Sequence, residues 1–196
     1  MKASILVLAS LLLVACDQPP AKEIAAAEIA LGQARQAGAD RYAVDRFKEA
    51  EAALHDAQRK VQEKDYRGAL SSATEAAERS RAAAQAAGAA RTVVRGAAEV
   101  AQAEVQAVLD ELRKEAADAK VPDAAFEELA PAMTQAREGL ASLQKLLDSG
   151  ELLEAQKSAA ALKGQVGPLP ARFREALEAW RKAHPRGRKP APKKTK

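Results

Sequence analysis

The chain has 196 residues, enough for one or two domains; alanine accounts for 50 of them and aromatic residues for only 3%. This composition favours long helices around thin cores over sheets, because alanine is the best helix former but contributes little apolar area. The net charge of +4 combines a mildly acidic body with eight Lys/Arg and no acid in residues 181–196, and the single cysteine, Cys16, excludes an intramolecular disulfide and a cysteine-based zinc site.

The first fifteen residues are typical of a secretory signal peptide. Lys2 supplies a short positive region, and residues 5–15, ILVLASLLLVA, form an apolar run. As a helix this run would rise only about 17 Å, whereas the hydrocarbon core of a bilayer is about 30 Å thick. We therefore expect residues 1–15 to direct export rather than to span the membrane.

The end of the apolar run, Leu13-Val14-Ala15-Cys16, resembles the lipobox of bacterial lipoproteins. In that family the thiol is acylated with a diacylglyceryl group, the peptide is cut before the cysteine, and the new amine is acylated as well. The resemblance implies that Cys16 is the lipidation site and the first mature residue. The anchor would be stable, because three acyl chains exceed the two membrane-binding signals that stable anchoring requires. The alternative is an ordinary signal peptide with an incidental cysteine.

The residues that follow Cys16 concern the choice of membrane. Asp17-Gln18 resembles the signal that retains enterobacterial lipoproteins in the inner membrane, which favours the inner over the outer membrane, on the periplasmic side. Pro19 and Pro20 disfavour helix for themselves and for the residue before each. We therefore expect residues 16–20 to form a short lipidated tether.

A helical pattern occurs twice in the body of the chain. Apolar residues recur at alternating spacings of three and four in residues 44–61 and again in residues 129–147, as in helices that pack along one face. From Phe47 onward, each apolar residue of the first set has a counterpart 86 residues later in the second set. The same correspondence continues beyond these sets, where Tyr66 corresponds to Leu152. The sequence therefore predicts two copies of a helical hairpin.

Turn residues divide this body into six expected helices. Gly38 can close the first helix in the left-handed conformation, and Asp65 precedes the third as an N-cap. Pro131 either kinks the fourth helix or marks its true start. The expected helices are residues 20–37, 44–63, 66–119, 122–148, 151–166 and 171–183.

The third expected helix contains no proline and would reach about 80 Å. Its weak points are Gly88 and Gly96, each of which costs up to about 1 kcal/mol relative to alanine. If the helix is continuous, two three-helix bundles share it, whereas a fold at Gly88 would give one bundle.

We therefore predict an all-α protein of elongated antiparallel helical bundles, in which two helical-hairpin repeats share one long helix and a disordered basic tail follows. The expected parts are the signal peptide 1–15, the lipidated tether 16–20, a first three-helix unit 21–87, a second helical unit 88–167, a short terminal helix 168–184 and the tail 185–196.

The segment 21–87 resembles an alanine-rich helical lipoprotein domain called domain of unknown function 4398. That family shows a GA…YAP turn, a helix of the form F/L…A…L…A, and then DY…A…A. The resemblance covers about a third of the chain and implies a periplasmic helical lipoprotein with no known activity; Val44 stands where the family usually has proline. The matching residues are Gly38-Ala39, Tyr42-Ala43, Phe47, Leu54, Ala57, Asp65-Tyr66 and Ala69.

No residue pattern in the sequence is typical of a catalytic or metal site. His55 and His184, the two histidines, lie far apart in the chain, whereas both kinds of site need convergent partners. The acidic pairs, such as Glu127/Glu128, lie among basic residues on polar faces, and a paired-acid mechanism needs two carboxylates across a cleft. We therefore expect that the protein is not an enzyme, and that it binds no metal and carries no cofactor apart from the lipid on Cys16.

The end of the chain has two features of interest. Phe173, Leu177 and Trp180 share one face of the last helix, which favours a stripe that docks on the bundle over a ligand site. One interpretation of the tail is that it binds anionic lipid or an anionic cell-wall polymer; near a membrane, each basic residue would contribute about 1 kcal/mol of binding free energy. The other is that it is a disordered terminus that keeps the protein soluble. Its basic residues are Arg186, Arg188, Lys189, Lys193, Lys194 and Lys196.

The function predicted from the sequence is that of a non-enzymatic, lipid-anchored periplasmic protein that acts as a tether, spacer or assembly scaffold in the envelope. Its expected partners are the membrane and an unidentified envelope protein, and not nucleic acid. The alternatives are a helical binding module for a small ligand or peptide, or an accessory subunit of an envelope enzyme. Thin alanine seams leave little room for a pocket, which favours the scaffold.

Overall fold

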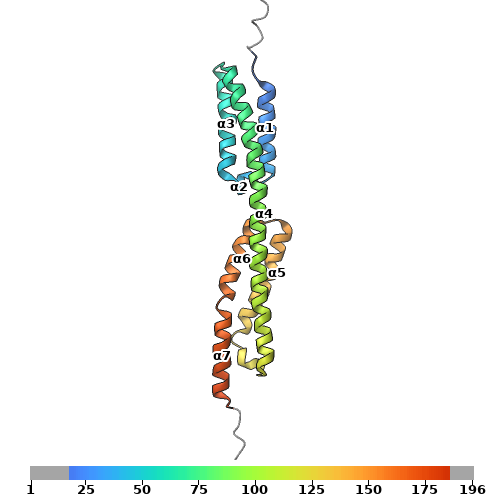
Figure 1. Cartoon of the computed structure of the whole chain (residues 1–196), viewed down its shortest axis with the longest axis vertical. Helices are drawn as coiled ribbons and strands as arrows, with labels where there is room; N and C mark the ends of the chain where they lie inside the picture. Colours follow the sequence, from blue (N-terminus) through green and yellow to red (C-terminus); the bar gives the residue numbers. More distant parts are fainter. Residues whose placement is uncertain (1–17, 186–196) are drawn as a thin grey trace, which may run out of the picture. The chain divides into compact units, whose positions relative to one another are not determined.

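The computed structural model describes residues 18–185, most of which are helical, and this part of the chain contains no strand (Figure 1). The prediction of an all-α protein is therefore confirmed. The described chain divides between two compact units, with the boundary between Thr92 and Val93. Several sequence predictions lie outside the described residues: the signal peptide, lipidation at Cys16, sorting through Asp17, and the tail with Arg186, Arg188, Lys189, Lys193, Lys194 and Lys196.

The first unit is a three-helix bundle. Helix α1 (Ala21–Gln36) is followed by the single turn α2 (Ala39–Tyr42), helix α3 (Val44–Gln62) and the first part of α4 (Tyr66–Ala119). Polar side chains link early α1 to late α3 and late α1 to early α3, so these two helices are antiparallel. Two contacts join α3 to α4 in the same crossed order, so that α4 runs parallel to α1.

Alanine dominates the core of this first unit. Only two large side chains, Leu54 and Phe47, take part in its two buried clusters, and the helices therefore approach one another closely. One cluster consists of Ala27, Ala30, Leu54, Ala76 and Ala77, and the other of Ala34, Ala39, Phe47, Ala83 and Ala87.

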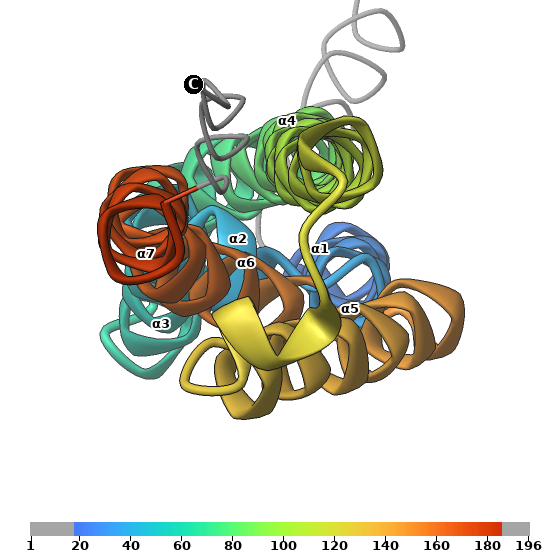
Figure 2. The same ribbon diagram turned by 90° about the horizontal axis from the view of Figure 1, so that it is seen from below.

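The second unit contains the rest of α4, a 3-10 turn η1 (Asp123–Phe126), α5 (Ala130–Ser149), α6 (Leu152–Val166) and α7 (Leu169–Ala183). Viewed along its axis, the link that leaves α4 leads into η1 across the end of this unit (Figure 2). The Phe126 ring of η1 stacks on Phe173 of α7, with 4.2 Å between ring centroids. Leucine and valine fill much of the core, including Val105, Leu109, Leu112, Leu140, Leu143, Leu147, Leu152, Leu162, Val166 and Leu169.

The predicted start of the fourth helix at residue 122 is wrong. Helix α5 begins at Ala130, and residues 123–126 form the 3-10 turn instead. Pro131 lies in the first turn of α5, which confirms the alternative that the helix truly begins there. In a helix interior, proline would remove a hydrogen bond and clash with the carbonyl group four residues earlier. The same preference places Pro170 in the first turn of α7, which begins two residues earlier than predicted.

Helix α4 is continuous from Tyr66 to Ala119, through Gly88 and Gly96. The alternative of a single bundle folded at Gly88 is therefore wrong. Both units use this helix, because the boundary between Thr92 and Val93 falls within it.

Two predicted turn residues adopt the roles that the sequence assigned to them. Gly38 has a φ of 84°, in the left-handed region, directly after α1. The side chain of Asp65 accepts a hydrogen bond of 2.9 Å from the backbone N–H of Gly68, which is the geometry of an N-cap at the start of α4. The single turn α2 after Gly38 was not predicted.

The 86-residue repeat extends to the backbone of the hairpin turns. Lys64, after α3, and Gly150, after α5, both have a positive φ, of 62° and 78°. In each turn the next residue, Asp65 or Glu151, donates its N–H to the carbonyl oxygen five positions earlier, at 2.9 and 3.0 Å. This bond pattern closes a helix through a left-handed residue, and both hairpins therefore use the same turn.

The repeat also extends further along the chain than its sequence pattern indicated. Buried positions of α4 in the first unit correspond to buried positions of α6 and α7 in the second. Larger residues in the second copy replace small ones, which explains why its core is less dominated by alanine. The pairs are Ala69/Ala155, Ala73/Ala159, Ala76/Leu162, Ser80/Val166, Ala83/Leu169 and Ala87/Phe173.

Because the two hairpin turns match, exchanging their left-handed residues should change the free energy of unfolding in opposite directions. We expect Lys64→Gly to raise the free energy of unfolding by about 1 kcal/mol, because a left-handed conformation costs a non-glycine residue roughly 1–2 kcal/mol. Gly150→Lys should lower it by a similar amount for the same reason. Urea unfolding followed by far-UV circular dichroism measures both changes. Glu63→Gly is the control: its φ of −78° is ordinary, so glycine there should give no gain, and a gain equal to that of Lys64→Gly would contradict the explanation.

The alanine core predicts a strong penalty for added volume. Ala73 is completely buried on α4, whereas Ala82 on the same helix is exposed. We expect Ala73→Leu to lower the free energy of unfolding by about 1–3 kcal/mol, since extra methylene groups force closely packed helices apart. Ala82→Leu should change it by less than about 0.5 kcal/mol, as is usual for surface substitutions. Equal thermal midpoints for the two variants would contradict this prediction, because they would show that the helix contact around Ala73 accepts a larger side chain.

Candidate functional site

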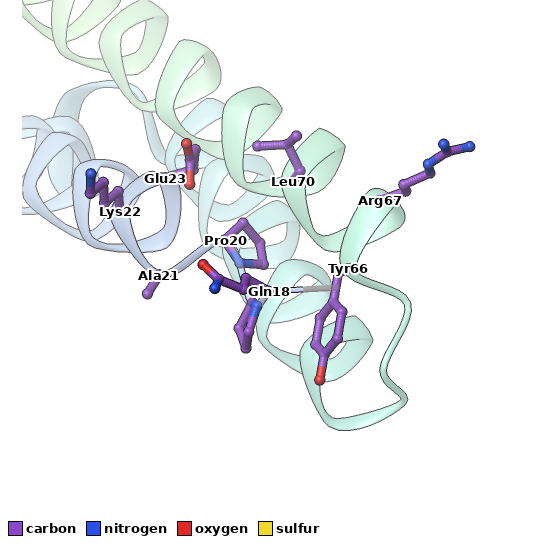
Figure 3. A pocket seen from close by; sticks show the side chains of 9 residues that line it. Gln18, Pro20, Ala21, Lys22, Glu23, Tyr66, Arg67 and Leu70 are labelled. Atoms are coloured by element: carbon purple, nitrogen blue, oxygen red, sulfur yellow. The ribbon is translucent and has the colours of Figure 1, made fainter. Parts of the chain in front are cut away.

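Gln18 is the one sequence-predicted functional residue that the structure describes, and it lies exposed just before α1. Pro20, two residues later, is buried. This segment borders a shallow surface depression of about 570 Å³ between the first turns of α1 and α4 (Figure 3). The lining residues are Gln18, Pro19, Pro20, Ala21, Lys22, Glu23, Tyr66, Arg67 and Leu70.

The depression combines apolar groups with two basic residues and one acidic residue, Glu23, at one end of the first unit. Leu70 is 44% exposed and Tyr66 is half-buried, while Lys22 and Arg67 are exposed. Such a surface suits contact with a membrane interface, where aromatic rings and basic groups are both favourable. Sequence reasoning did not group these residues, because only the parallel packing of α1 and α4 brings their first turns together.

A polar cluster joins α3 to α4 near the same end of the unit. Buried Ser72 donates a hydrogen bond of 2.7 Å to the Oδ2 of Asp56, and Lys60 donates one of 2.9 Å to the Ser72 hydroxyl oxygen. The Lys60 ammonium group also lies 2.7 Å from the Asp56 Oδ2, and Arg59 pairs with the other carboxylate oxygen. The cluster thus connects two helices through one buried hydroxyl group.

The charges of this cluster are fixed by its hydrogen bonds. Those from Lys60, Ser72 and Arg59, in this order of size, hold the pKa of Asp56 well below its usual range. In turn Asp56, followed by Glu63, raises the pKa of Arg59. An aspartate that stays ionised, with its oxygens already engaged, is unsuited to acid–base catalysis, and we interpret the cluster as structural.

The two histidines do not converge with other functional groups. His55 is exposed on α3 of the first unit, whereas His184 follows α7 in the second. The His184 ring stacks on Trp180 with 3.9 Å between centroids, and its Nδ1 lies 3.2 Å from the Trp180 carbonyl oxygen. Among residues 18–185, no three His, Cys, Asp or Glu side chains are grouped as a metal site would require.

Trp180 borders two depressions at the end of the second unit. Phe173 is 1% exposed and docks in the core, but Trp180 at the other end of the predicted stripe is only half-buried. The larger depression has a volume of about 520 Å³ and is lined by Ala119, Lys120, Val121, Pro122, Trp180, Arg181 and His184. The smaller one, of about 310 Å³, is lined by Ala124, Ala125, Glu127, Glu128, Ala176, Ala179, Trp180 and Ala183.

Within the described part of the chain, no helix has both the length and the apolar character that crossing a bilayer would need. Comparison with known proteins gave no match to a family model, to a curated protein or to a solved structure.

The ionised state of Asp56 predicts a pH-dependent effect of Asp56→Asn. Because the folded pKa of Asp56 is depressed, its ionised form stabilises the fold fully above the unfolded pKa of about 3.9. This contribution is lost as the pH falls from there through the folded pKa. We therefore expect the variant to have a lower thermal midpoint than the original chain at neutral pH, and a smaller difference at about pH 2 to 3.

Glu78→Gln provides the matched control for this experiment. Glu78 is exposed on α4, and none of the ion pairs among the described residues involves it. Its neutralisation should change the midpoint little at either pH. A difference between Asp56→Asn and the original chain that stays constant from neutral to acidic pH would contradict the ionic explanation.

Proposed function

We propose that this protein is lipid-anchored through Cys16 at a bacterial membrane, faces the periplasm and acts there as a non-enzymatic tether, spacer or assembly scaffold. The observation that carries the proposal is the lipobox-like segment Leu13–Cys16, which is followed after only four residues by the helical body. The resemblance of residues 21–87 to domain of unknown function 4398 supports the same interpretation.

The short distance from Cys16 to α1 determines how the first unit would meet the membrane. Five residue steps separate Cys16 from Ala21, and a fully extended chain of that length spans at most about 18 Å. An anchored Cys16 therefore keeps the start of α1 close to the lipid headgroups. The same end of the unit presents Tyr66, Leu70 and Arg67, whose mixed apolar and cationic character suits that position. Asp17 and Gln18 favour the inner membrane.

The packing of the helices supports a scaffold. Cores of alanine and leucine bring the helices together, and the depressions described above lie at helix ends rather than inside the bundles. Charged groups such as Arg79 with Glu49 and Glu75, or Lys163 with Glu104, pair across the surface. Surfaces of this kind suit contact with other proteins or polymers better than the enclosure of a substrate.

The second candidate is a helical binding module for a small ligand or peptide, and a separate alternative is an accessory subunit of an envelope enzyme. The half-buried Trp180 beside a depression of about 520 Å³ favours this candidate. Both candidates require the same location, and a ligand site at one end of a scaffold would combine them.

Replacement of the cysteine tests the anchor. We expect Cys16→Ala to abolish incorporation of a labelled fatty acid in cells, because acylation needs the thiol. The original chain should incorporate the label and, after purification, have a mature N-terminus at Cys16 with the mass of the attached lipid. Radiolabel counting and mass spectrometry of the N-terminal peptide provide the two measurements.

Ser10→Ala is the control, since it alters the same apolar run but leaves the lipobox-like residues intact. This variant should be labelled as strongly as the original chain. A mature N-terminus without lipid in the original chain, or undiminished labelling of Cys16→Ala, would contradict the proposal.

A further inference from the structure

The larger depression beside Trp180 joins three segments of the second unit. Ala119 ends α4, residues 120–122 form the link to η1, and Trp180 and Arg181 lie in the last turn of α7. Its volume of about 520 Å³ is within the range of about 300–1,000 Å³ that is common for ligand pockets.

The charges around this depression favour an anion. Lys120 and Arg181 line it, His184 lies beside them, and none of its lining residues is acidic. Within residues 18–185, neither Lys120 nor Arg181 belongs to any of the ion pairs of the structure. Because two cations without acidic partners create a positive potential, an incoming carboxylate or phosphate group would be attracted.

Trp180 adds a preference for a ring. The indole is half-buried and lines the depression together with His184, which stacks on it at an angle of 19°. A sugar ring has one face of C–H groups that packs well on such an aromatic surface, while its polar groups hydrogen-bond at the edges. The depression therefore combines an aromatic contact with anion-binding groups.

Other surroundings of Trp180 argue against insertion into a bilayer. Stable insertion needs several apolar side chains on one face. The large hydrophobic residues that the structure exposes lie elsewhere, at Ile29, Val44, Leu70, Val93 and Val100. A single half-buried indole, with Lys120 and Arg181 lining one of its depressions and Glu127 and Glu128 lining the other, suits a soluble or polymeric ligand better than an acyl-chain surface.

We propose that this depression binds peptidoglycan of the cell wall, with Trp180 stacked against a sugar ring and with Arg181 and Lys120 bound to carboxylates of its stem peptides. The inference rests on the proposed periplasmic location. The binding site itself does not require the lipid on Cys16, so binding by purified protein and anchoring in cells are tested separately.

Intrinsic fluorescence gives a direct readout, because Trp180 is the only tryptophan of the chain. The protein is the mature chain with Cys16→Ala, which removes the lipid. We expect a saturable change of emission with soluble peptidoglycan fragments and little change with neutral N-acetylglucosamine oligomers. An equal response to the neutral oligomers would overturn the role of charge, and a response to phosphatidylglycerol vesicles alone would assign the depression to the membrane instead.

Sedimentation with insoluble peptidoglycan tests the residues. We expect Trp180→Ala and Arg181→Gln each to weaken binding about tenfold, as is typical of aromatic and arginine anchors of an interface. Arg174→Gln is the matched control, since it removes one positive charge from an exposed position of α7 that does not line the depression. It should weaken binding less than about twofold, because exposed charges outside the contact contribute little. Equal losses for Arg174→Gln and Arg181→Gln, or full binding by Trp180→Ala with intact helicity, would overturn the proposal.

Discussion

Close packing of alanine is the constraint on which the first unit depends. Ala27, Ala50, Ala57, Ala73 and Ala83 are completely buried, and each contributes little apolar area. Many short contacts must therefore replace a few large ones, and the helices must stay close together for those contacts to form. The polar cluster of Asp56, Lys60 and Ser72 supplements these contacts where α3 and α4 meet. The same closeness leaves little interior space, so candidate sites lie at helix ends.

The second unit fills the same repeat with larger residues. Where α4 of the first unit has Ala83 and Ala87, the second has Leu169 and Phe173, both buried. Phe173 stacks on Phe126 of η1, a short turn that precedes α5 much as the single turn α2 precedes α3 in the first copy. The chain that is one continuous helix in the first copy is divided between α6 and α7 in the second, at residues 167–168. The same turn and the same pattern of buried positions thus accommodate small core side chains in one copy and large ones in the other.

Spacing and turn chemistry determined much of what the sequence predicted correctly. The helices follow from apolar residues at intervals of three and four, and Gly38 and Asp65 act through local backbone geometry that a short segment specifies. The start of α5 was ambiguous because Pro131 fits both a kink and a first turn, and the structure places it in the first turn. The depressions beside Tyr66 and Trp180 were not predicted, since each joins segments far apart in the chain. Lipidation at Cys16 stays a prediction from the sequence.

A scaffold and a binding module differ in what lies between their helices. Closely packed alanine seams favour a protein that works through its surface and its anchor, whereas an internal cavity would favour a ligand carrier. Crystals of the mature protein under xenon pressure measure this directly, because xenon enters empty apolar cavities. We expect no xenon to bind among α1, α3 and α4 of the first unit. Xenon density within that bundle would contradict this expectation.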